Sequence, residues 1–416
     1  MRMKTRTAEL ASASVTALLV LGAAACGNPS SEQRHWLGSW SSSQTAAADV
    51  WGPNWSTAGF SNHSVRQSFR PTIGGDRVRI TLSNRFGDRP LRITAATVGI
   101  TAGPAAVLPG TLRQLLFGHS QRTEIPAGTE QTSDAVDLSI PALHPITVTL
   151  YLADHTGPAT FHFLGNATSY RAVGDHAADT GGASFTESSR SWYYVSDVEV
   201  SGTGSRRGVV AFGDSLTDGA GATMDVDNRY PDVLAERLAA AGESRAVLNA
   251  GIGGNRVVSD SVYVGQRALT RFRRDVLDKK GVGTVILLSG INDIGTSELG
   301  DPRLEPSPEV TADHLIAEYR DLIALARAHG VRIIGGTLLP YKGARYYSER
   351  GEAIREAVNS WIRESGEFDA VADFERALVS RTDADALDPT YDSGDHLHPS
   401  PAGYAAMAAV IDLSRL

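Results

Sequence analysis

The sequence predicts a two-domain protein in which an antiparallel β-sandwich precedes a parallel, doubly wound α/β domain. A chain of 416 residues is longer than one hydrophobic core usually supports. From about Trp36 to Val200, apolar and polar residues alternate with a period of two. After residue 206, continuous apolar runs alternate with helical patterns. The small residues 201–205 (Ser-Gly-Thr-Gly-Ser) lie between the two patterns and predict a hinge. The predicted domains are therefore 36–200 and 206–416.

The N-terminal residues 1–25 have the pattern of an export signal. Arg2, Lys4 and Arg6 give a basic start, which Glu9 interrupts, and an apolar stretch follows from about residue 13 to residue 25. This stretch is too short to span a bilayer as a helix and has the length of a signal-peptide core. The sequence therefore predicts a signal peptide and an extracellular or cell-surface location.

The only cysteine, Cys26, directly follows the small residues 22–25 (Gly-Ala-Ala-Ala). This segment resembles a bacterial lipoprotein signal, in which the cysteine is acylated and becomes the first residue of the mature protein. Ala23 departs from that pattern, which more often has leucine or another branched residue there. The alternative is a plain signal peptide with an incidental cysteine. Acylation would attach the protein to a membrane face through a polar tether, residues 26–35, without any span.

Composition excludes several other classes of protein. The hydrophobic fraction is 42% and the charged fraction 21%, which is typical of a soluble globular protein. The net charge is −8 and no block of lysine and arginine occurs, so nucleic acid is not an expected partner. With one cysteine, no disulfide can form within the chain.

The first domain is predicted to be a sandwich of short strands. Alternating segments occur at 65–70, 77–82, 146–151 and 193–200. Glycine-containing turn signals separate them at 74–75, 87–88, 103–104 and 181–182. Short alternating strands with turns between them are typical of antiparallel sandwiches.

In the second domain, five strands alternate with helices. The strands are predicted near 208–212, 246–249, 284–289, 331–338 and 370–374, and the helices near 231–241, 266–279, 308–329, 352–364 and 401–412. In a parallel sheet of this kind, ligands bind beyond the carboxyl ends of the strands. Candidate functional residues are therefore sought directly after each strand.

Four short motifs occur at these positions. They are 213–217 (Gly-Asp-Ser-Leu-Thr), 253–255 (Gly-Gly-Asn), 290–293 (Gly-Ile-Asn-Asp) and 395–398 (Asp-His-Leu-His), the last of which precedes the final helix. Each alone has an ordinary alternative: a capping serine, a flexible glycine turn, an asparagine that caps a turn, and a pair of surface or metal-binding histidines. The first motif is also not the G-x-S-x-G elbow of the α/β-hydrolases. All four together, converging at one edge of the sheet, are a much stronger signal.

The four motifs together resemble those of the SGNH/GDSL hydrolase family of esterases and lipases. The resemblance covers residues 208–412, and the β-domain before them is additional. The resemblance implies a flavodoxin-like three-layer α/β/α domain and ester hydrolysis without a metal or another cofactor. The second motif departs from the family, because Gly253 and Asn255 replace a common Ser-Gly-Asp arrangement.

The resemblance assigns roles to individual residues. Ser215 would be the nucleophile, His398 the general base and Asp395 the group that orients the histidine. The oxyanion would be bound by the N–H groups of Ser215 and Gly254 and by the amide of Asn292. Gly254 is preferred over its neighbour Gly253. The acids Asp214 and Asp293 are expected to have structural roles.

The sequence says least about the substrate. Small-molecule and polysaccharide esters are both expected, with short acyl groups on carbohydrate favoured because a sandwich beside an exported esterase resembles the architecture of polysaccharide-acting enzymes. The alternatives are a lipase or lysophospholipase, and a surface glycan-binding lipoprotein with an inactive esterase domain. Three tyrosines, Tyr341, Tyr346 and Tyr347, either form a stacking wall for the substrate or pack internally.

Overall fold

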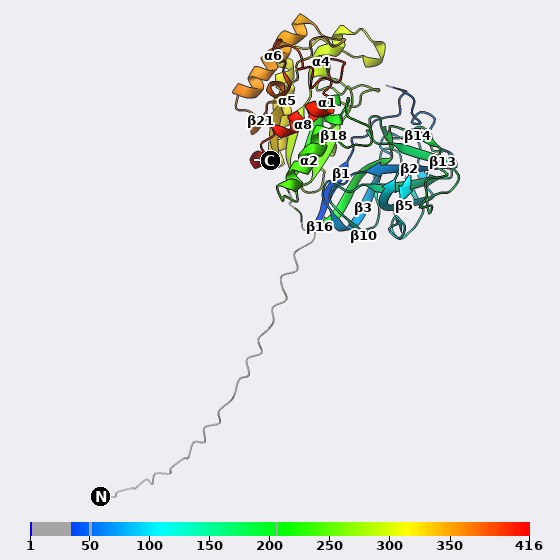
Figure 1. Cartoon of the computed structure of the whole chain (residues 1–416). Helices are drawn as coiled ribbons and strands as arrows, with labels where there is room; N and C mark the ends of the chain where they lie inside the picture. The colour runs from blue at the N-terminus through cyan, green and yellow to red at the C-terminus, as the bar shows by residue number, and fades with distance from the viewer. Residues whose placement is uncertain (2–34, 50–51, 203, 205–206) are drawn as a thin grey trace. The chain divides into compact units, whose positions relative to one another are not determined.

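The computed structural model describes residues 1, 35–49, 52–202, 204 and 207–416 (Figure 1). The predicted signal peptide 1–25, Cys26 and the tether up to residue 34 lie outside the described residues. The described residues from His35 to Leu416 belong to one compact unit. His35, the last residue of the predicted tether, lies at the start of the first strand, β1 (His35–Ser41).

The first half is a sandwich of two antiparallel sheets. In one sheet β1 pairs with β16, β16 with β3, and β3 with both β10 and β9. In the other the order is β14-β13-β2-β11-β5-β6, with β7 also on β5. The bounds are β2 (His63–Phe69), β3 (Gly75–Ser83), β5 (Ala95–Gly103), β6 (Ala106–Val107), β7 (Arg113–Gln114), β9 (Glu130–Thr132), β10 (Val136–Ile140), β11 (Ile146–Leu152), β13 (Ser169–Val173), β14 (Glu187–Ser189) and β16 (Val195–Gly202). Two short ladders join β4 (Leu91–Ile93) to β8 (Thr123–Ile125) and β12 (Phe161–His162) to β15 (Trp192–Tyr193).

Aromatic side chains contribute to the core of this sandwich. The ring of Trp40 lies 4.3 Å from that of Phe69 and 4.9 Å from that of Trp192, the latter edge to face. In β3 the alternation buries Val78 and Ile80 on either side of the more exposed Arg79, as the sequence predicts, whereas residues 81–83 are all buried.

The predicted strand 193–200 is wrong in its details. Tyr194 has a φ of +63°, which interrupts an extended chain, so the segment divides into β15 and β16. The strand β16 then continues to Gly202, which places the first two residues of the predicted hinge inside the sheet. Residues 203, 205 and 206 of this region lie outside the described residues.

The second half contains a five-stranded parallel sheet in the order β18-β17-β19-β20-β21. Counted along the chain this is 2-1-3-4-5, the flavodoxin-like order. The strands are β17 (Gly208–Gly213), β18 (Val247–Gly251), β19 (Val282–Leu288), β20 (Arg332–Gly336) and β21 (Ala370–Ala372). The helix α2 (Tyr230–Ala240) contacts α8 (Pro401–Ala409), while α5 (Ala312–Ala328) contacts α3 (Ala268–Phe272) and α6 (Glu349–Glu364). Right-handed crossovers place these two groups on opposite faces of the sheet.

Two predicted elements differ from the structure. The predicted helix 266–279 is α3 followed by a π-helical turn, Arg273–Leu277. The predicted strand 370–374 ends at Ala372, because the side chain of Asp373 accepts a hydrogen bond from the N–H of Arg376 and caps α7 (Phe374–Leu378).

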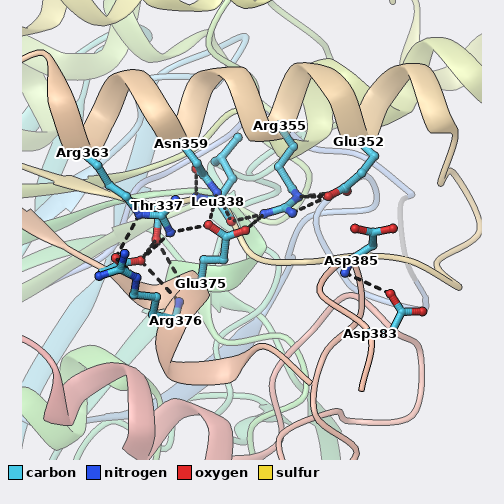
Figure 2. Close-up of polar contacts among 11 residues, drawn as sticks. Thr337, Leu338, Glu352, Arg355, Asn359, Arg363, Glu375, Arg376, Asp383 and Asp385 are labelled. Atoms are coloured by element: carbon cyan, nitrogen blue, oxygen red, sulfur yellow. Dashed lines mark hydrogen bonds and ion pairs between the residues drawn. The ribbon is translucent and has the colours of Figure 1, made fainter. Parts of the chain in front are cut away.

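A charged network fixes α6 to the chain that follows β20 (Figure 2). Arg355 is 1% exposed; it pairs with Glu352 on the same helix and lies 2.5 Å from a carboxylate oxygen of Glu375 on α7. Asn359 accepts the N–H of Leu338 at 2.7 Å and donates to its carbonyl at 2.8 Å. Buried charges need such partners, because an unpaired one costs several kcal/mol, roughly 3–5.

The sandwich and the parallel sheet each have their own hydrophobic core, and polar contacts join them. Lys279 lies 2.5 Å from Asp197, and Arg70 lies 2.7 Å from Glu236. The N–H of Gly38 in β1 donates to the carbonyl of Lys280 at 2.9 Å. Within the described part of the chain, no helix is both long and apolar enough to cross a bilayer.

Candidate active site

The parallel register brings three of the predicted motifs to the same sheet edge. Gly213, the last residue of the central strand β17, pairs with Gly251 of β18 and with Leu288 of β19. The segments that follow these strands therefore leave the sheet side by side. A Cβ atom at position 213 would lie 2.1 Å from the carbonyl oxygen of Leu288, so only glycine fits there.

Ser215 begins a one-turn helix, α1 (Ser215–Asp218), directly after β17. The carboxylate of Asp214 caps this helix by accepting the N–H of Leu216 at 3.0 Å. Gly219 ends the helix with a φ of +105°. The tight turn at each end leaves the Ser215 side chain at the sheet edge, where the residue is 7% exposed.

Ser215, His398 and Asp395 form a hydrogen-bonded chain. The Oγ atom of Ser215 lies 2.9 Å from Nε2 of His398, and Nδ1 of His398 lies 2.6 Å from Oδ2 of Asp395. Because a carboxylate can only accept, Nδ1 carries a proton, and Nε2 is available to accept the serine hydroxyl.

Asp395 is held ionised by its surroundings. Its Oδ1 atom accepts the N–H groups of Leu397 and His398 at 3.0 and 2.8 Å. Partial burial works against the charge, but the hydrogen bonds and the neighbouring His398 ring hold the pKa of Asp395 well below its usual range.

The other histidine of the motif, His396, has a separate partner. Its Nδ1 atom lies 2.7 Å from Asp392, and its side chain is 56% exposed. The residue has a φ of +63°, a left-handed conformation that turns the chain between the two histidines. The structure therefore brings His398, and not His396, to Ser215.

The glycine segment after β18 has one engaged and one available N–H group. The N–H of Gly253 donates to Oδ2 of Asp218 at 2.9 Å. Gly254 has a φ of +77°, which favours glycine. Since the N–H of Gly253 is already bound, Gly254 is the better candidate for an oxyanion donor.

Asn292 lies in the first turn of α4 (Ile291–Gly295), directly after β19. Its Nδ2 group donates to the carbonyl of Asn255 at 3.1 Å, and its Oδ1 accepts the hydroxyl of Tyr346 at 3.2 Å. These two bonds fix the amide, which is 4% exposed, beside the glycine segment and leave its second N–H for another acceptor.

Asp214 and Asp293 are both buried and bind backbone groups. Asp293 accepts the N–H groups of Val257 and Val258 at distances of 2.9 to 3.0 Å. Burial raises the pKa of Asp293 to about 6 and that of Asp214 to about 7. Neither acid contacts the Ser215–His398 pair in the hydrogen bonds of the described residues, which agrees with the structural role predicted for them.

Three residues around the site were not found from the sequence. Arg271, which is fully buried, donates to the carbonyls of Gly213 and Ala250 at 2.7 and 2.8 Å and to Asn255 at 2.9 Å. Asp218 and His162 form a buried pair with 2.9 Å between Nε2 and Oδ1. Asp218 directly follows the first motif, which was a usable signal, whereas the partners of the other two are distant in sequence.

The three tyrosines do not form a common stacking wall. Tyr341 is fully buried and Tyr346 is 8% exposed, with its ring against Gly295. Packing is therefore the correct alternative for these two residues, and only Tyr347 is partly exposed.

One group of acids among the described residues could approach a metal ion. Oxygens of Glu352, Glu356 and Asp385 lie within 4.8 Å of one another. Figure 2 shows that Glu352 is bound by Arg355, and Lys342 lies 3.4 Å from Asp385. Two of the three acids, Glu352 and Asp385, thus have cationic partners within the chain, so the group gives little support for a metal. The absence of a metal from catalysis stays a prediction.

Comparison with known proteins identifies the α/β domain. Residues 211–406 match the model of the GDSL-like Lipase/Acylhydrolase family. Solved structures similar to the chain include a GDSL-like lipase from Bacteroides thetaiotaomicron, with 19% identity, a TM-score of 0.37, and coverage of 50% of this chain and 88% of that one. An acetylxylan esterase from Geobacillus stearothermophilus has 23% identity, a TM-score of 0.37, and coverage of 50% and 93%. A comparison with curated proteins gave no match.

The fold, the motif order and the family match define a hydrolase that acts on carboxylic esters. Residues 211–406, slightly under half of the chain, are therefore similar to the GDSL-like lipase/acylhydrolase family.

The buried carboxyl of Asp214 predicts a specific pH dependence of stability. Its pKa is raised to about 7 in the folded protein, so the unfolded chain releases this proton first as the pH rises. The free energy of unfolding of the wild type therefore falls between roughly pH 4 and 7, by up to about 1.4 kcal/mol per pH unit. The Asp214→Asn variant has no carboxyl to titrate at this position. The difference in free energy of unfolding between this variant and wild type should therefore increase across that pH interval and level off above it.

Urea unfolding at several pH values measures this difference. The exposed Asp321 on α5 provides a control variant, Asp321→Asn, for the loss of one negative charge from the surface. A constant offset for Asp214→Asn from pH 4 to 8 would show that Asp214 is ionised in the folded protein.

Proposed function

We propose that this protein is an exported serine esterase that uses Ser215, His398 and Asp395 to remove short acyl groups from carbohydrate. The observation that carries the proposal is the hydrogen-bonded chain from Oγ of Ser215 through His398 to Asp395, with distances of 2.9 and 2.6 Å. These are the contacts that an activated serine nucleophile needs.

Catalysis then proceeds through an acyl-enzyme. Nε2 of His398 takes the Ser215 proton as Oγ attacks the ester carbonyl, and the same nitrogen gives the proton to the leaving alcohol. Water repeats the sequence on the acyl-enzyme, releasing the carboxylic acid and restoring Ser215. The ionised Asp395 holds the ring in the tautomer that accepts at Nε2 and stabilises the imidazolium.

The negative charge that develops on the carbonyl oxygen needs donors in fixed positions. We assign this role to the N–H groups of Ser215 and Gly254 and to Nδ2 of Asn292. The bonds that Asn292 makes to Asn255 and Tyr346 support the assignment, because they hold the amide before the substrate arrives.

The exposed side chains beside Ser215 and His398, which we call the rim of the site, favour a polar substrate. Asp395 has a half-exposed side chain, and that of His396 is 56% exposed. An acylated sugar suits such a rim better than a long acyl chain does. Acetylxylan is the substrate named for one of the similar structures.

Export and anchoring complete the proposal. The signal-like residues 1–25 and the cysteine at position 26 support a location at the cell surface or outside the cell, with acylation of Cys26 as the only membrane attachment.

The two histidines of the last motif give a matched test of the triad. Ser215→Ala and His398→Ala should each lower kcat by about 10⁴-fold or more, and the double variant should be little worse, because the triad acts as a unit. His396→Asn, which tolerates the left-handed backbone, should keep kcat within about threefold of wild type. Steady-state hydrolysis of nitrophenyl acetate measures all four. An inactive His396 variant beside an active His398 variant would overturn the assignment.

Asn292→Ala tests the oxyanion site. It should lower kcat by roughly 10²–10³-fold with little change in KM, because the amide acts on charge present only in the transition state. Asn84 of the sandwich is a control of similar burial whose amide also binds backbone carbonyls, so Asn84→Ala should affect stability and leave kcat unchanged. A rise in KM with intact kcat would make Asn292 a substrate-binding residue instead.

The acyl preference distinguishes this proposal from a lipase. Nitrophenyl esters from acetate to dodecanoate should give the highest kcat/KM at acetate or butyrate, and acetylated xylan should release acetate, because the exposed side chains of Asp395 and His396 at the site are polar. A maximum at octanoate or longer, or faster hydrolysis of a lysophospholipid, contradicts the carbohydrate assignment. Absence of labelling by a fluorophosphonate would favour a binding protein with an inactive esterase domain.

A further inference from the structure

A histidine of the β-sandwich contacts the segment that carries the nucleophile. His162 is in β12, and its ring lies against Trp192 at 5.6 Å, nearly parallel. Its Nε2 atom lies 2.9 Å from Oδ1 of Asp218, the last residue of α1. His162 is 3% exposed and Asp218 is 2% exposed, so the pair is shielded from water.

The contacts of His162 require both of its ring nitrogens to donate. Nδ1 lies 2.8 Å from the carbonyl oxygen of Ser43, and Nε2 faces the carbonyl of Leu164 as well as the Asp218 carboxylate. Carbonyl and carboxylate oxygens only accept, so the ring fits this position as an imidazolium. Burial disfavours the charged ring, but Asp218 raises the pKa of His162 above its usual value.

The carboxylate of Asp218 also binds the glycine segment of the candidate oxyanion site. While Oδ1 faces His162, Oδ2 accepts the N–H of Gly253 at 2.9 Å. Gly254 is the next residue, so the position of its N–H depends on how Gly253 is held. The backbones of Gly251 and Asp218 are also in close contact, since a Cβ atom at Gly251 would lie 2.2 Å from the N atom of Asp218.

A second residue of the same sandwich segment supports the end of α1. The Nδ2 group of Asn166 donates to the carbonyls of Asp218 and Gly219 at 3.2 and 3.0 Å. Residues 162–166 therefore hold both the side chain and the backbone of the turn that follows Ser215.

We propose that His162 is a positioning residue of the esterase, which fixes the oxyanion-binding glycine segment through Asp218 and Gly253. The inference rests on the proposed function and deepens it: the β-sandwich is part of the catalytic unit and not a separable accessory module. The residue touches no reacting atom and acts only by holding Asp218. Its effect therefore falls on transition-state stabilisation and not on substrate binding.

The test compares three variants of the full chain. His162→Ala removes every donor, and His162→Gln keeps one donor that can reach Asp218. His176→Ala removes a histidine of the same domain that also pairs with an aspartate, Asp179 at 2.7 Å, but in a more exposed position. For each, a fluorophosphonate titration counts the functional sites, and kcat and KM for nitrophenyl acetate are expressed per titrated site.

The expected kcat per site falls about 10–100-fold for His162→Ala, with KM within about twofold of wild type, because only the oxyanion geometry is disturbed. His162→Gln should recover part of this loss, and His176→Ala should match wild type. A purely structural role would instead reduce the number of titrated sites and leave kcat per site unchanged, and that result overturns the inference.

Two further outcomes keep the inference separate from the proposed function. If wild-type protein neither titrates nor hydrolyses the ester, the proposed function fails and the inference fails with it. If wild type is active and both His162 variants, Ala and Gln, have the same kcat per site as wild type, the inference fails alone.

Discussion

The carboxylate of Asp218 accepts hydrogen bonds from two parts of the chain that are far apart in sequence, the ring of His162 and the N–H of Gly253. It lies at the end of the helix that Ser215 begins, so this single group joins the nucleophile turn, the glycine segment and the β-sandwich. A buried carboxylate is stable only with such partners, since leaving one unpaired typically costs about 3–5 kcal/mol. The geometry of the oxyanion site is therefore coupled to the packing of a domain that carries none of the four motifs.

The parallel sheet supplies the other constraint on the site. Three adjacent strands end in register, and Arg271 binds the carbonyl groups at the ends of two of them, Gly213 and Ala250. A fixed sheet edge allows short loops to carry functional groups with little freedom. The histidine loop is different, because its exposed turn is held by local bonds from Asp392 and Asp395 to the chain on either side. Ser215 and the proposed oxyanion donors are thus held by the core, and His398 by its own loop.

Much of this could be predicted from the sequence, for identifiable reasons. Strand–helix alternation predicted the sheet and the order of the loops, because it is a local pattern. The pairing of His398 with Ser215, which spans 183 residues, was predicted only through the resemblance of the four motifs to the SGNH/GDSL family. The interruption at Tyr194 and the capping by Asp373 changed element boundaries, since a single backbone angle or cap decides them. The His162–Asp218 pair spans 56 residues and joins β12 of the sandwich to α1 of the α/β domain. Periodicity carries no information about such a contact, and the same holds for the bonds of Arg271 to Gly213 and Asn255.

The central claim is that Ser215 attacks an ester whose oxyanion is bound by Ser215, Gly254 and Asn292. The most direct test is a crystal structure of the protein after reaction with an alkyl fluorophosphonate, whose tetrahedral adduct resembles the intermediate. The account predicts a covalent bond from phosphorus to Oγ of Ser215. It also predicts that the phosphoryl oxygen lies within about 3 Å of the N–H groups of Ser215 and Gly254 and of Nδ2 of Asn292. An adduct on another residue, or a phosphoryl oxygen directed away from Gly254 and Asn292, would contradict it.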